Sequence, residues 1–203
     1  MSDFISKRNK VSLHGKVVRK EHTDNESAEF EGGFLHALGQ KGVAVPKVIS
    51  ADREILHMEY IKGEPIPDFL SRSDSIARCK EAASSITHWF DTFYRAVNHK
   101  DTAEIRGDVN GRNFIITDSG VVGVDFEERA FGKMETDFGK LLAFIATYSY
   151  ADDRPQRLLG ELLLNCFVKR FPISGEAILD EKEKELEEMT KRRNVKYNLS
   201  EPV

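Results

Sequence analysis

Alternating apolar and polar positions dominate the first sixty residues, a period of two that is typical of half-buried β-strands. β-Branched and aromatic residues form short runs there, separated by polar turns. The predicted strands cover residues 3–7, 11–14, 16–20, 45–49 and 55–60. One apolar stripe with helical spacing interrupts this pattern. It predicts a helix over residues 27–38, with Ser27 as the N-cap and Gly39 at the C-terminal end.

From about residue 64 the apolar positions recur at intervals of three and four, which indicates amphipathic helices. The longest stripe predicts a helix from Ser73, its cap, to Asn98. Three later stripes predict helices over residues 137–148, 156–171 and 176–194. A β-rich first third followed by helices predicts an α+β fold with two lobes and a cleft near residues 60–64. We expect an N-terminal lobe over residues 1–62 and a helical C-terminal lobe over residues 63–203.

A predicted β-hairpin interrupts the helical part of the chain at residues 106–126, where two apolar runs flank an Asp-Ser-Gly turn. Asp108 and Asn113 precede the first strand, and Asp125 follows the second. Phosphoryl transfer to a hydroxyl uses such a set, in which one carboxylate orients the acceptor while an amide and a second carboxylate hold Mg²⁺. The spacing thus predicts Asp108 as catalytic base and Asn113 and Asp125 as metal ligands. The alternative is a turn aspartate, a loop asparagine and a capping aspartate.

Composition narrows the classes of function. The 203 residues carry a net charge of −4, with 40% hydrophobic and 32% charged residues. This balance allows a real core and makes nucleic acid an unlikely partner. No stretch approaches the roughly 18 apolar residues of a membrane span, so we expect a soluble cytoplasmic protein. Cys79 and Cys166 lie far apart in apolar helical patterns and are expected to be reduced core thiols.

The motifs taken together resemble the protein-kinase-like superfamily. Its signature is a strand lysine, a helical glutamate, a D-x-x-x-x-N loop and a D-F-G motif. In the same order, this chain carries Lys20 at the end of a Val-Val-Arg-Lys run, Glu31, the loop 108–113 and the run 125–127. The resemblance implies a bilobal protein-kinase-like fold and an ATP-dependent phosphotransferase.

The resemblance also implies roles for single residues. Lys20 would pair the α- and β-phosphates of ATP while Glu31 holds it, although Glu29 competes for the role of partner. Val18, on the same strand face, would cover the adenine. Asp137 resembles a buried aspartate that braces the catalytic loop in this family. An ordinary helix N-cap is the alternative for Asp137, and both roles can hold together.

Residues 55–63 resemble the family's hinge strand, written L-x-x-E-Y-I-x-G. By this match Met58 would lie at the back of the adenine pocket. The carbonyl of Glu59 and the amide of Ile61 would then meet the adenine edge, and Ile115 would form the floor. Because these contacts are mostly made by the backbone, they constrain the side chains little.

The chain also departs from the family's pattern. No G-x-G-x-x-G precedes Lys20, so the cover of the phosphates is unusual. Arg106 stands in place of the catalytic-loop histidine, Asn110 in place of the lysine of protein kinases, and Glu127 in place of the D-F-G glycine. We expect different support for the catalytic loop and an extra carboxylate near the metal.

Only eleven residues separate Asp125 from Asp137, too few for a peptide-docking activation loop. In these departures the chain resembles the aminoglycoside/choline phosphotransferases and compact atypical kinases such as the RIO group more than typical protein kinases. The implied ligands are ATP, Mg²⁺ (with Mn²⁺ as the alternative) and a hydroxyl acceptor. The residue at position 110 favours a small-molecule acceptor, whereas the small size of the chain favours a protein serine or threonine. A non-catalytic nucleotide-binding scaffold is a further alternative, and the oligomeric state stays open.

Overall fold

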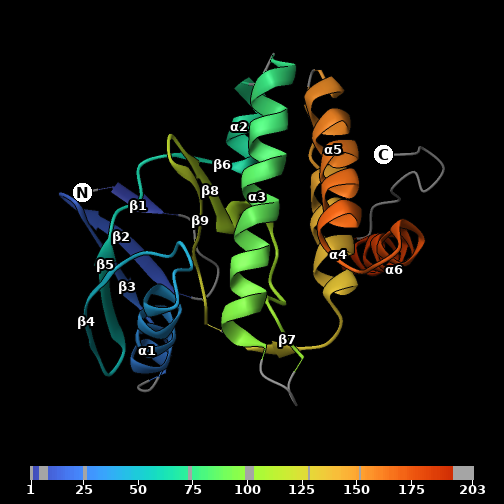
Figure 1. Cartoon of the computed structure of the whole chain (residues 1–203). Coiled ribbons are helices and arrows are strands. Elements are labelled where there is room, and N and C mark those ends of the chain that lie inside the picture. The colour runs from blue at the N-terminus through green and yellow to red at the C-terminus, as the bar shows by residue number, and fades with distance from the viewer. Residues whose placement is uncertain are drawn as a thin grey trace.

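The computed structural model describes residues 2–4, 9–24, 27–72, 75–98, 103–127, 129–150 and 152–193. A β-rich part that contains the N-terminal strands lies beside a helical part, with a β-hairpin between them (Figure 1). This arrangement agrees with the predicted α+β fold of two lobes. The exact boundary at residues 62 and 63 stays a prediction.

Five antiparallel strands form the sheet of the β-rich part, in the order β1-β2-β3-β5-β4. They are β1 (Ser2–Phe4), β2 (Lys10–His14), β3 (Val17–Glu21), β4 (Val48–Asp52) and β5 (Ile55–Glu59). Helix α1 (Ser27–Gln40) packs on β4 and β5. A Cβ at Gly32 would lie 2.8 Å from the Cβ of Ala51, so the glycine that lowers helix propensity lets α1 approach the sheet.

Strand β4 begins three residues later than predicted and runs to Asp52. The prediction was wrong because Pro46 lacks an N–H for a ladder and the chain before Val48 is irregular. The turn follows at Arg53, whose φ is 49°. Residues 5–7 of the first predicted strand lie outside the described residues.

Both predicted ends of α1 need correction. Ser27 is the first helical residue, and its N–H donates to Asp24 Oδ1 at 3.0 Å, so the capping side chain is Asp24. At the other end the left-handed residue is Gly42, with φ of 83°, instead of Gly39. The N–H of Val43 donates to the carbonyl of Leu38 at 3.1 Å and closes the helix end.

The helical part contains five α-helices among the described residues. They are α2 (Ile66–Arg72), α3 (Ile76–Val97), α4 (Met134–Ala146), α5 (Arg154–Arg170) and α6 (Gly175–Arg193). Helix α3 packs along α5, and α4 packs against α6 (Figure 1). The four long helices were predicted with ends shifted by a few residues, and Ser73, the expected cap of α3, lies outside the described residues. None of the described helices is long and apolar enough to cross a membrane.

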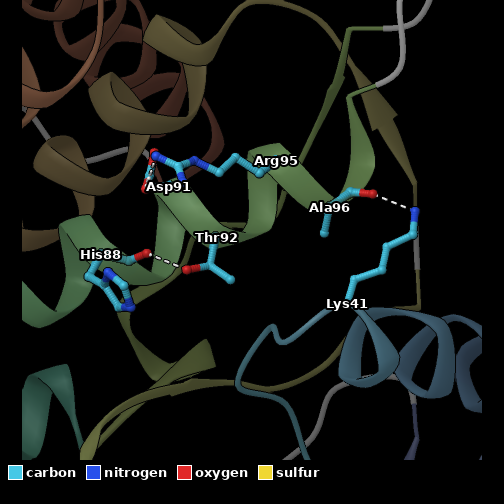
Figure 2. A pocket seen from close by; sticks show the side chains of 6 residues that line it. All are labelled: Lys41, His88, Asp91, Thr92, Arg95 and Ala96. Atoms are coloured by element: carbon cyan, nitrogen blue, oxygen red, sulfur yellow. Dashed lines mark hydrogen bonds and ion pairs between the residues drawn. The ribbon is translucent and has the colours of Figure 1, made fainter.

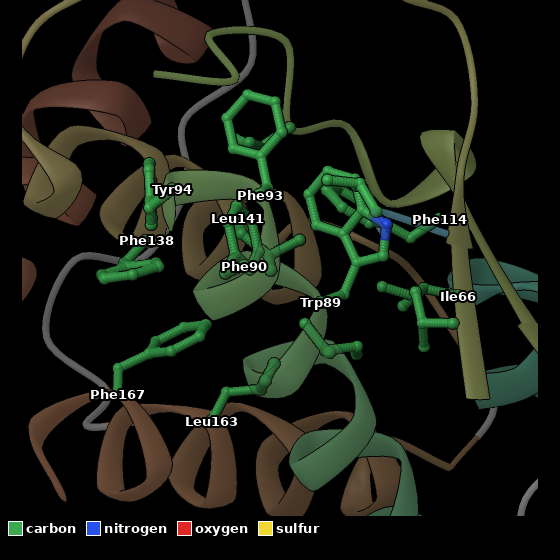
Figure 3. Packing of buried hydrophobic residues seen from close by; sticks show 14 of the residues in the cluster. Ile66, Trp89, Phe90, Phe93, Tyr94, Phe114, Phe138, Leu141, Leu163 and Phe167 are labelled. Carbon is green, nitrogen blue, oxygen red and sulfur yellow. The ribbon is translucent and has the colours of Figure 1, made fainter. Parts of the chain in front are cut away.

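Aromatic side chains from α3, α4 and α5 fill the core of the helical part (Figure 3). The rings of Phe138 and Phe167 stack with centroids 4.0 Å apart. Trp89 of α3 meets the ring of Phe114 edge-on at 5.2 Å and donates from Nε1 to the carbonyl of Ala44 at 2.8 Å. Trp89 therefore packs in the core, and its ring fixes the hairpin to the helix that supports it.

The predicted hairpin is present as β8 (Phe114–Thr117) and β9 (Gly120–Gly123), preceded by a 3₁₀ turn at Gly111–Asn113. A two-residue strand, β6 (Glu64–Pro65), adds to its edge. Two more short strands, β7 (Glu104–Ile105) and β10 (Ala130–Phe131), pair with each other and bracket the hairpin. These two-residue strands are too short to leave a periodic signal in the sequence.

Candidate active site

Lys20 of β3 is the centre of a buried charge cluster. Its Nζ lies 2.8 Å from Glu31 Oε2, 2.5 Å from Asp125 Oδ1 and 2.9 Å from Glu127 Oε1. The lysine side chain is only 4% exposed. Burial alone would lower the pKa of Lys20, but the charges of Glu31 and Asp125 outweigh it and raise the pKa above its ordinary value. The ammonium therefore stays charged.

The side chain of Glu31 connects α1 to β3 and to the segment after β9. One carboxylate oxygen accepts from Lys20, and the other accepts from the backbone N–H of Phe126 at 2.8 Å. Although burial opposes the charged form, hydrogen bonding from His22 and the charge of Lys20 lower the pKa of Glu31. Glu29, the competing partner, instead accepts from the backbone of Arg53 at 3.3 Å. The geometry favours Glu31 over Glu29 as the partner of Lys20.

Asp125 follows β9 in a left-handed conformation, with φ of 66°. Such a conformation costs a non-glycine residue on the order of 1 kcal/mol or more and persists only where other contacts hold it. The Arg106 guanidinium supplies them, since its Nη2 donates to the carbonyls of Val124 (2.8 Å) and Asp125 (2.5 Å). Burial opposes ionisation of Asp125, but the charge of Lys20 prevails and lowers its pKa.

Glu127 extends the cluster toward the strand β2. It lies beside both Lys20 and the carboxyl of Asp125, and its Oε1 accepts from Asn9 Nδ2 at 2.6 Å. Burial and the hydrogen bond with Asp125 raise the pKa of Glu127. The extra carboxylate expected at this position is therefore part of the cluster, whereas the bond to Asn9 had no signal in the sequence.

Asp137 of α4 braces the start of the catalytic loop. Its carboxylate accepts from the backbone N–H groups of Arg106 (2.6 Å) and Gly107 (2.8 Å) and from the hydroxyl of Tyr94 (2.7 Å). Burial raises the pKa of Asp137, while these hydrogen bonds favour its charged form. The alternative N-cap role is wrong, because α4 already begins at Met134.

Arg106 stands in place of the family's histidine, and its side chain contacts the segment after β9. The residue is buried, and its guanidinium lies 4.1 Å from the centroid of the Phe126 ring. Together with its bonds to two carbonyls, this contact ties the catalytic loop to the segment after β9. These particular contacts were not predicted from the sequence.

The three residues of the predicted catalytic set lie at the ends of the hairpin. Asp108 is exposed, and its Oδ1 accepts from the backbone N–H of Asn110 at 3.2 Å. Asn113 is buried, with its Nδ2 3.5 Å from the carbonyl of Asp108. The N–H of Val124 donates to the carbonyl of Asn113 at 2.9 Å, which brings Asp125 beside Asn113. Their catalytic and metal-binding roles stay predictions.

The predicted adenine contacts come from β3, β5 and β8. Val18 and Met58 are cross-strand partners. Ile115 lies opposite Pro65 in the hairpin sheet. A Cβ at Gly63 would come 2.7 Å from Ile115 Cγ2, so the chain after β5 passes directly over this isoleucine.

At the end of β5 the side chain of Glu59 points to Lys47 and accepts a hydrogen bond from its backbone N–H at 2.9 Å. The next residue, Tyr60, donates its N–H to the carbonyl of Lys16 at 2.9 Å, and Ile61 follows in irregular chain. Contacts of Glu59 and Ile61 with a nucleotide stay predictions.

The donor set suits a hard divalent cation that a substrate helps to bind. Asn113 offers an amide oxygen, and Asp125 offers a carboxylate whose side chain is 40% exposed. Within the described part of the chain, no three His, Cys, Asp or Glu side chains gather to hold a metal. Asn113 and Asp125 therefore offer oxygen atoms of the kind that a hard divalent cation binds, and their role as ligands stays a prediction.

A separate hollow of about 350 Å³ lies between the loop after α1 and one face of α3 (Figure 2). Lys41 reaches across it and donates to the carbonyl of Ala96 at 2.6 Å. On α3 the carboxylate of Asp91 pairs with Arg95 at 3.1 Å and with Arg170 of α5 at 2.6 Å. None of the predicted site residues lines this hollow.

Comparison with known proteins supports the same fold. A sequence model of the RIO domain matches residues 2–134. The structure of an APH(2'')-IIa complex with gentamicin is similar over 93% of this chain and 81% of its own, with 14% identity and a TM-score of 0.64. The amicoumacin kinase hAmiN, in complex with AMP-PNP, Ca²⁺ and Ami, is similar over 100% and 83%, with 11% identity and a TM-score of 0.62.

An aminoglycoside-3'-phosphotransferase of type VIII is similar over 89% of this chain and 91% of its own, with 12% identity and a TM-score of 0.59. At such identities the likeness establishes the fold, which is protein-kinase-like as predicted. A search of curated proteins found no significant match.

Proposed function

Because the chain belongs to the RIO domain family, we propose that it is an ATP-dependent phosphotransferase that transfers the γ-phosphoryl group to a hydroxyl. One observation carries this proposal. Lys20 of β3 contacts Glu31 of α1 and Asp125 after β9 at 2.8 Å and 2.5 Å, although these residues are distant in the sequence. A lysine is almost never fully buried unless its charge is paired, and the partners of Lys20 connect the predicted phosphate-binding and metal-binding elements.

Lys20 contacts the phosphates of ATP and neutralises part of their charge, while Glu31 fixes its position. Asn113 and Asp125 hold a divalent cation, which supplies further charge neutralisation at the phosphates when it is bound. The exposed part of the Asp125 carboxylate supports this assignment. Mg²⁺ is the proposed ion and Mn²⁺ the alternative.

Asp108 orients the acceptor hydroxyl and accepts its proton. The acceptor oxygen forms a bond to the γ-phosphorus while the bond from that phosphorus to the β–γ bridging oxygen breaks, and ADP leaves. The exposure of Asp108 supports this role, because an acceptor must reach its carboxylate. Catalysis consists mainly of positioning and charge neutralisation.

The base of ATP lies between the two parts of the fold. Val18 covers the adenine, and Met58 lies behind it. The backbone of Glu59 and Ile61 binds the adenine edge, and Ile115 forms the floor. The cross-strand pairing of Val18 with Met58 supports this assignment, since one bound ring can touch both side chains.

A small-molecule hydroxyl is the favoured acceptor, and Asn110 is the observation that favours it. Protein kinases carry a lysine two residues after the catalytic aspartate, and this chain does not. Solved structures with the same fold hold gentamicin or Ami. A protein serine or threonine is the second candidate, favoured by the small size of the chain.

The test is to incubate the purified chain with γ-labelled ATP and Mg²⁺, with either an aminoglycoside panel or a general protein substrate as acceptor. We expect ADP formation that EDTA abolishes and that a hydroxyl-bearing small molecule stimulates. Labelling of protein would favour the second candidate. ATP binding without any ADP formation would contradict phosphotransfer and support a nucleotide-binding scaffold.

A further inference from the structure

Tyr148, just beyond the end of α4, holds the middle of the catalytic loop. Its hydroxyl donates to Asn110 Oδ1 at 3.3 Å, and the same hydroxyl lies directly against the backbone of Gly111. A Cβ at Gly111 would lie 2.7 Å from that oxygen, so the close approach requires a glycine. The loop backbone and the tyrosine therefore fit against each other with no room for a larger side chain.

Helix α4 carries two anchors of the catalytic loop, one near each end. Asp137 in its first turn accepts from the N–H groups of Arg106 and Gly107. Tyr148 lies two residues beyond its last residue, Ala146, and contacts Asn110 and Gly111. The helix between the anchors is fixed in the core by fully buried residues. Asp108 lies between the two anchored pairs, so one rigid helix determines where its backbone runs.

A chain of hydrogen bonds leads from Tyr148 to the carboxylate of Asp108. Asn110 Oδ1 accepts from Tyr148 and from the N–H of Arg112 at 3.0 Å, which fixes the side chain of Asn110. The backbone N–H of Asn110 donates in turn to Asp108 Oδ1 at 3.2 Å. Burial and the neighbouring Tyr150 raise the pKa of Tyr148 to about 12, so its hydroxyl keeps its proton near neutral pH.

We propose that Tyr148 is a positioning residue that, through Asn110, sets the orientation of the Asp108 carboxylate for phosphoryl transfer. This inference rests on the proposed function. Tyr148 does not contact the acceptor or ATP in this role. It acts by restricting the loop, and small errors in the position of a catalytic group cost large factors in rate.

The chain offers a matched control in Tyr150. The two rings lie edge to face with centroids 6.3 Å apart, but the Tyr150 hydroxyl donates to the carbonyl of Pro67 at 3.0 Å. Tyr148→Phe and Tyr150→Phe therefore remove the same group from adjacent aromatic rings, and only the first breaks a bond to the catalytic loop.

The experiment measures Mg²⁺-dependent ATP hydrolysis, with water as acceptor, and amide hydrogen exchange at Gly111. For Tyr148→Phe we expect kcat to fall at least about tenfold, KM for ATP to stay within about twofold, and Gly111 to exchange at least about tenfold faster. Tyr150→Phe should match the unmodified chain in all three. Asn110→Ala should lower kcat, and adding Tyr148→Phe to it should cause little further loss.

Three results would overturn the inference: unchanged exchange at Gly111 in Tyr148→Phe, unchanged kcat in that variant, or equal losses in Tyr150→Phe. An unmodified chain that binds ATP but forms no ADP, either with water or with the acceptors of the proposed assay, would instead overturn the proposed function and the catalytic role of Tyr148. Amide hydrogen exchange at Gly111 would still decide whether Tyr148 restricts the loop.

Discussion

Two regions of the candidate site are stabilised in different ways. Around Lys20, a buried ammonium pairs directly with three carboxylates. Around Asp108, the predicted catalytic side chain is exposed, and Asp137 accepts hydrogen bonds from the loop backbone instead. In the charge cluster, the side chains proposed to bind ligands also stabilise the fold. In the braced loop, the proposed catalytic side chain and the stabilising contacts belong to different residues. We expect substitutions at Lys20 to change folding and nucleotide affinity together, and substitutions at Asp108 to change turnover alone.

The largest expected effect belongs to the braced loop. Asp108→Asn should lower turnover of ATP by about 10²–10⁴-fold, because a neutral amide cannot accept the acceptor's proton. Its affinity for ATP should stay within roughly twofold, since the loss falls on the transition state alone. Phosphate release and calorimetric titration of ATP measure the two quantities. Small, equal changes in both would refute the proposed separation of turnover from binding.

The charge cluster should respond through stability. Lys20→Met leaves Glu31 buried without its ammonium partner and should cost about 3–5 kcal/mol of the free energy of unfolding. ATP affinity should fall as well. Chemical denaturation measures the first quantity. The control is Lys16→Met, at an exposed position of the preceding turn, which should stay within about 0.5 kcal/mol. Equal stability of the two variants would show that the cluster does not stabilise the fold.

Arg106 connects the two regions and should give an intermediate effect. Arg106→Met leaves the carbonyls of Val124 and Asp125 without a donor and should cost about 1–3 kcal/mol of unfolding free energy. Arg112→Met, at an exposed position of the same loop, is the control and should change it by no more than about 0.5 kcal/mol. If Arg106→Met lowered the free energy of unfolding no more than the control does, Arg106 would not connect the two regions.

The smallest effect concerns Glu127. Glu127→Gln removes a negative charge beside Lys20 and should strengthen ATP binding about fivefold, because one unit charge at contact distance in water contributes about 1 kcal/mol. Glu21→Gln, which lies next to Lys20 in β3 but pairs with Arg19, should leave the affinity unchanged. If Glu127→Gln weakened ATP binding in the presence of Mg²⁺, the carboxylate would assist the cation instead of repelling the phosphates.

Sequence reasoning identified the elements that carry motifs. The hairpin and the long helices follow from spacing and periodicity, which survive in a single sequence. The Lys20–Glu31 pairing follows instead from the resemblance to the protein-kinase-like superfamily. Helix ends and the strand β4 were less accurate, because Asp24 and Gly42 compete with equally plausible neighbours for the cap positions.

The contacts that support the site were beyond prediction from sequence. Tyr148 and Asn110 are separated by 38 residues, and their hydrogen bond depends on how α4 packs in the core. Asn9 and Glu127 are 118 residues apart, and neither lies in a motif that points to the other. Arg106 was noticed only as a substitution for histidine, since its partners are backbone carbonyls, which leave no trace in the sequence.

In the proposed function, Lys20 and Asp125 form one site for a nucleotide and a divalent cation. Calorimetric titration of ATP with and without Mg²⁺, into the unmodified chain and into Asp125→Asn, tests it most directly. We predict that Mg²⁺ strengthens ATP binding by the unmodified chain at least about tenfold and that Asp125→Asn loses this gain. An equal gain from Mg²⁺ in both proteins, or no ATP binding by the unmodified chain, would contradict the account.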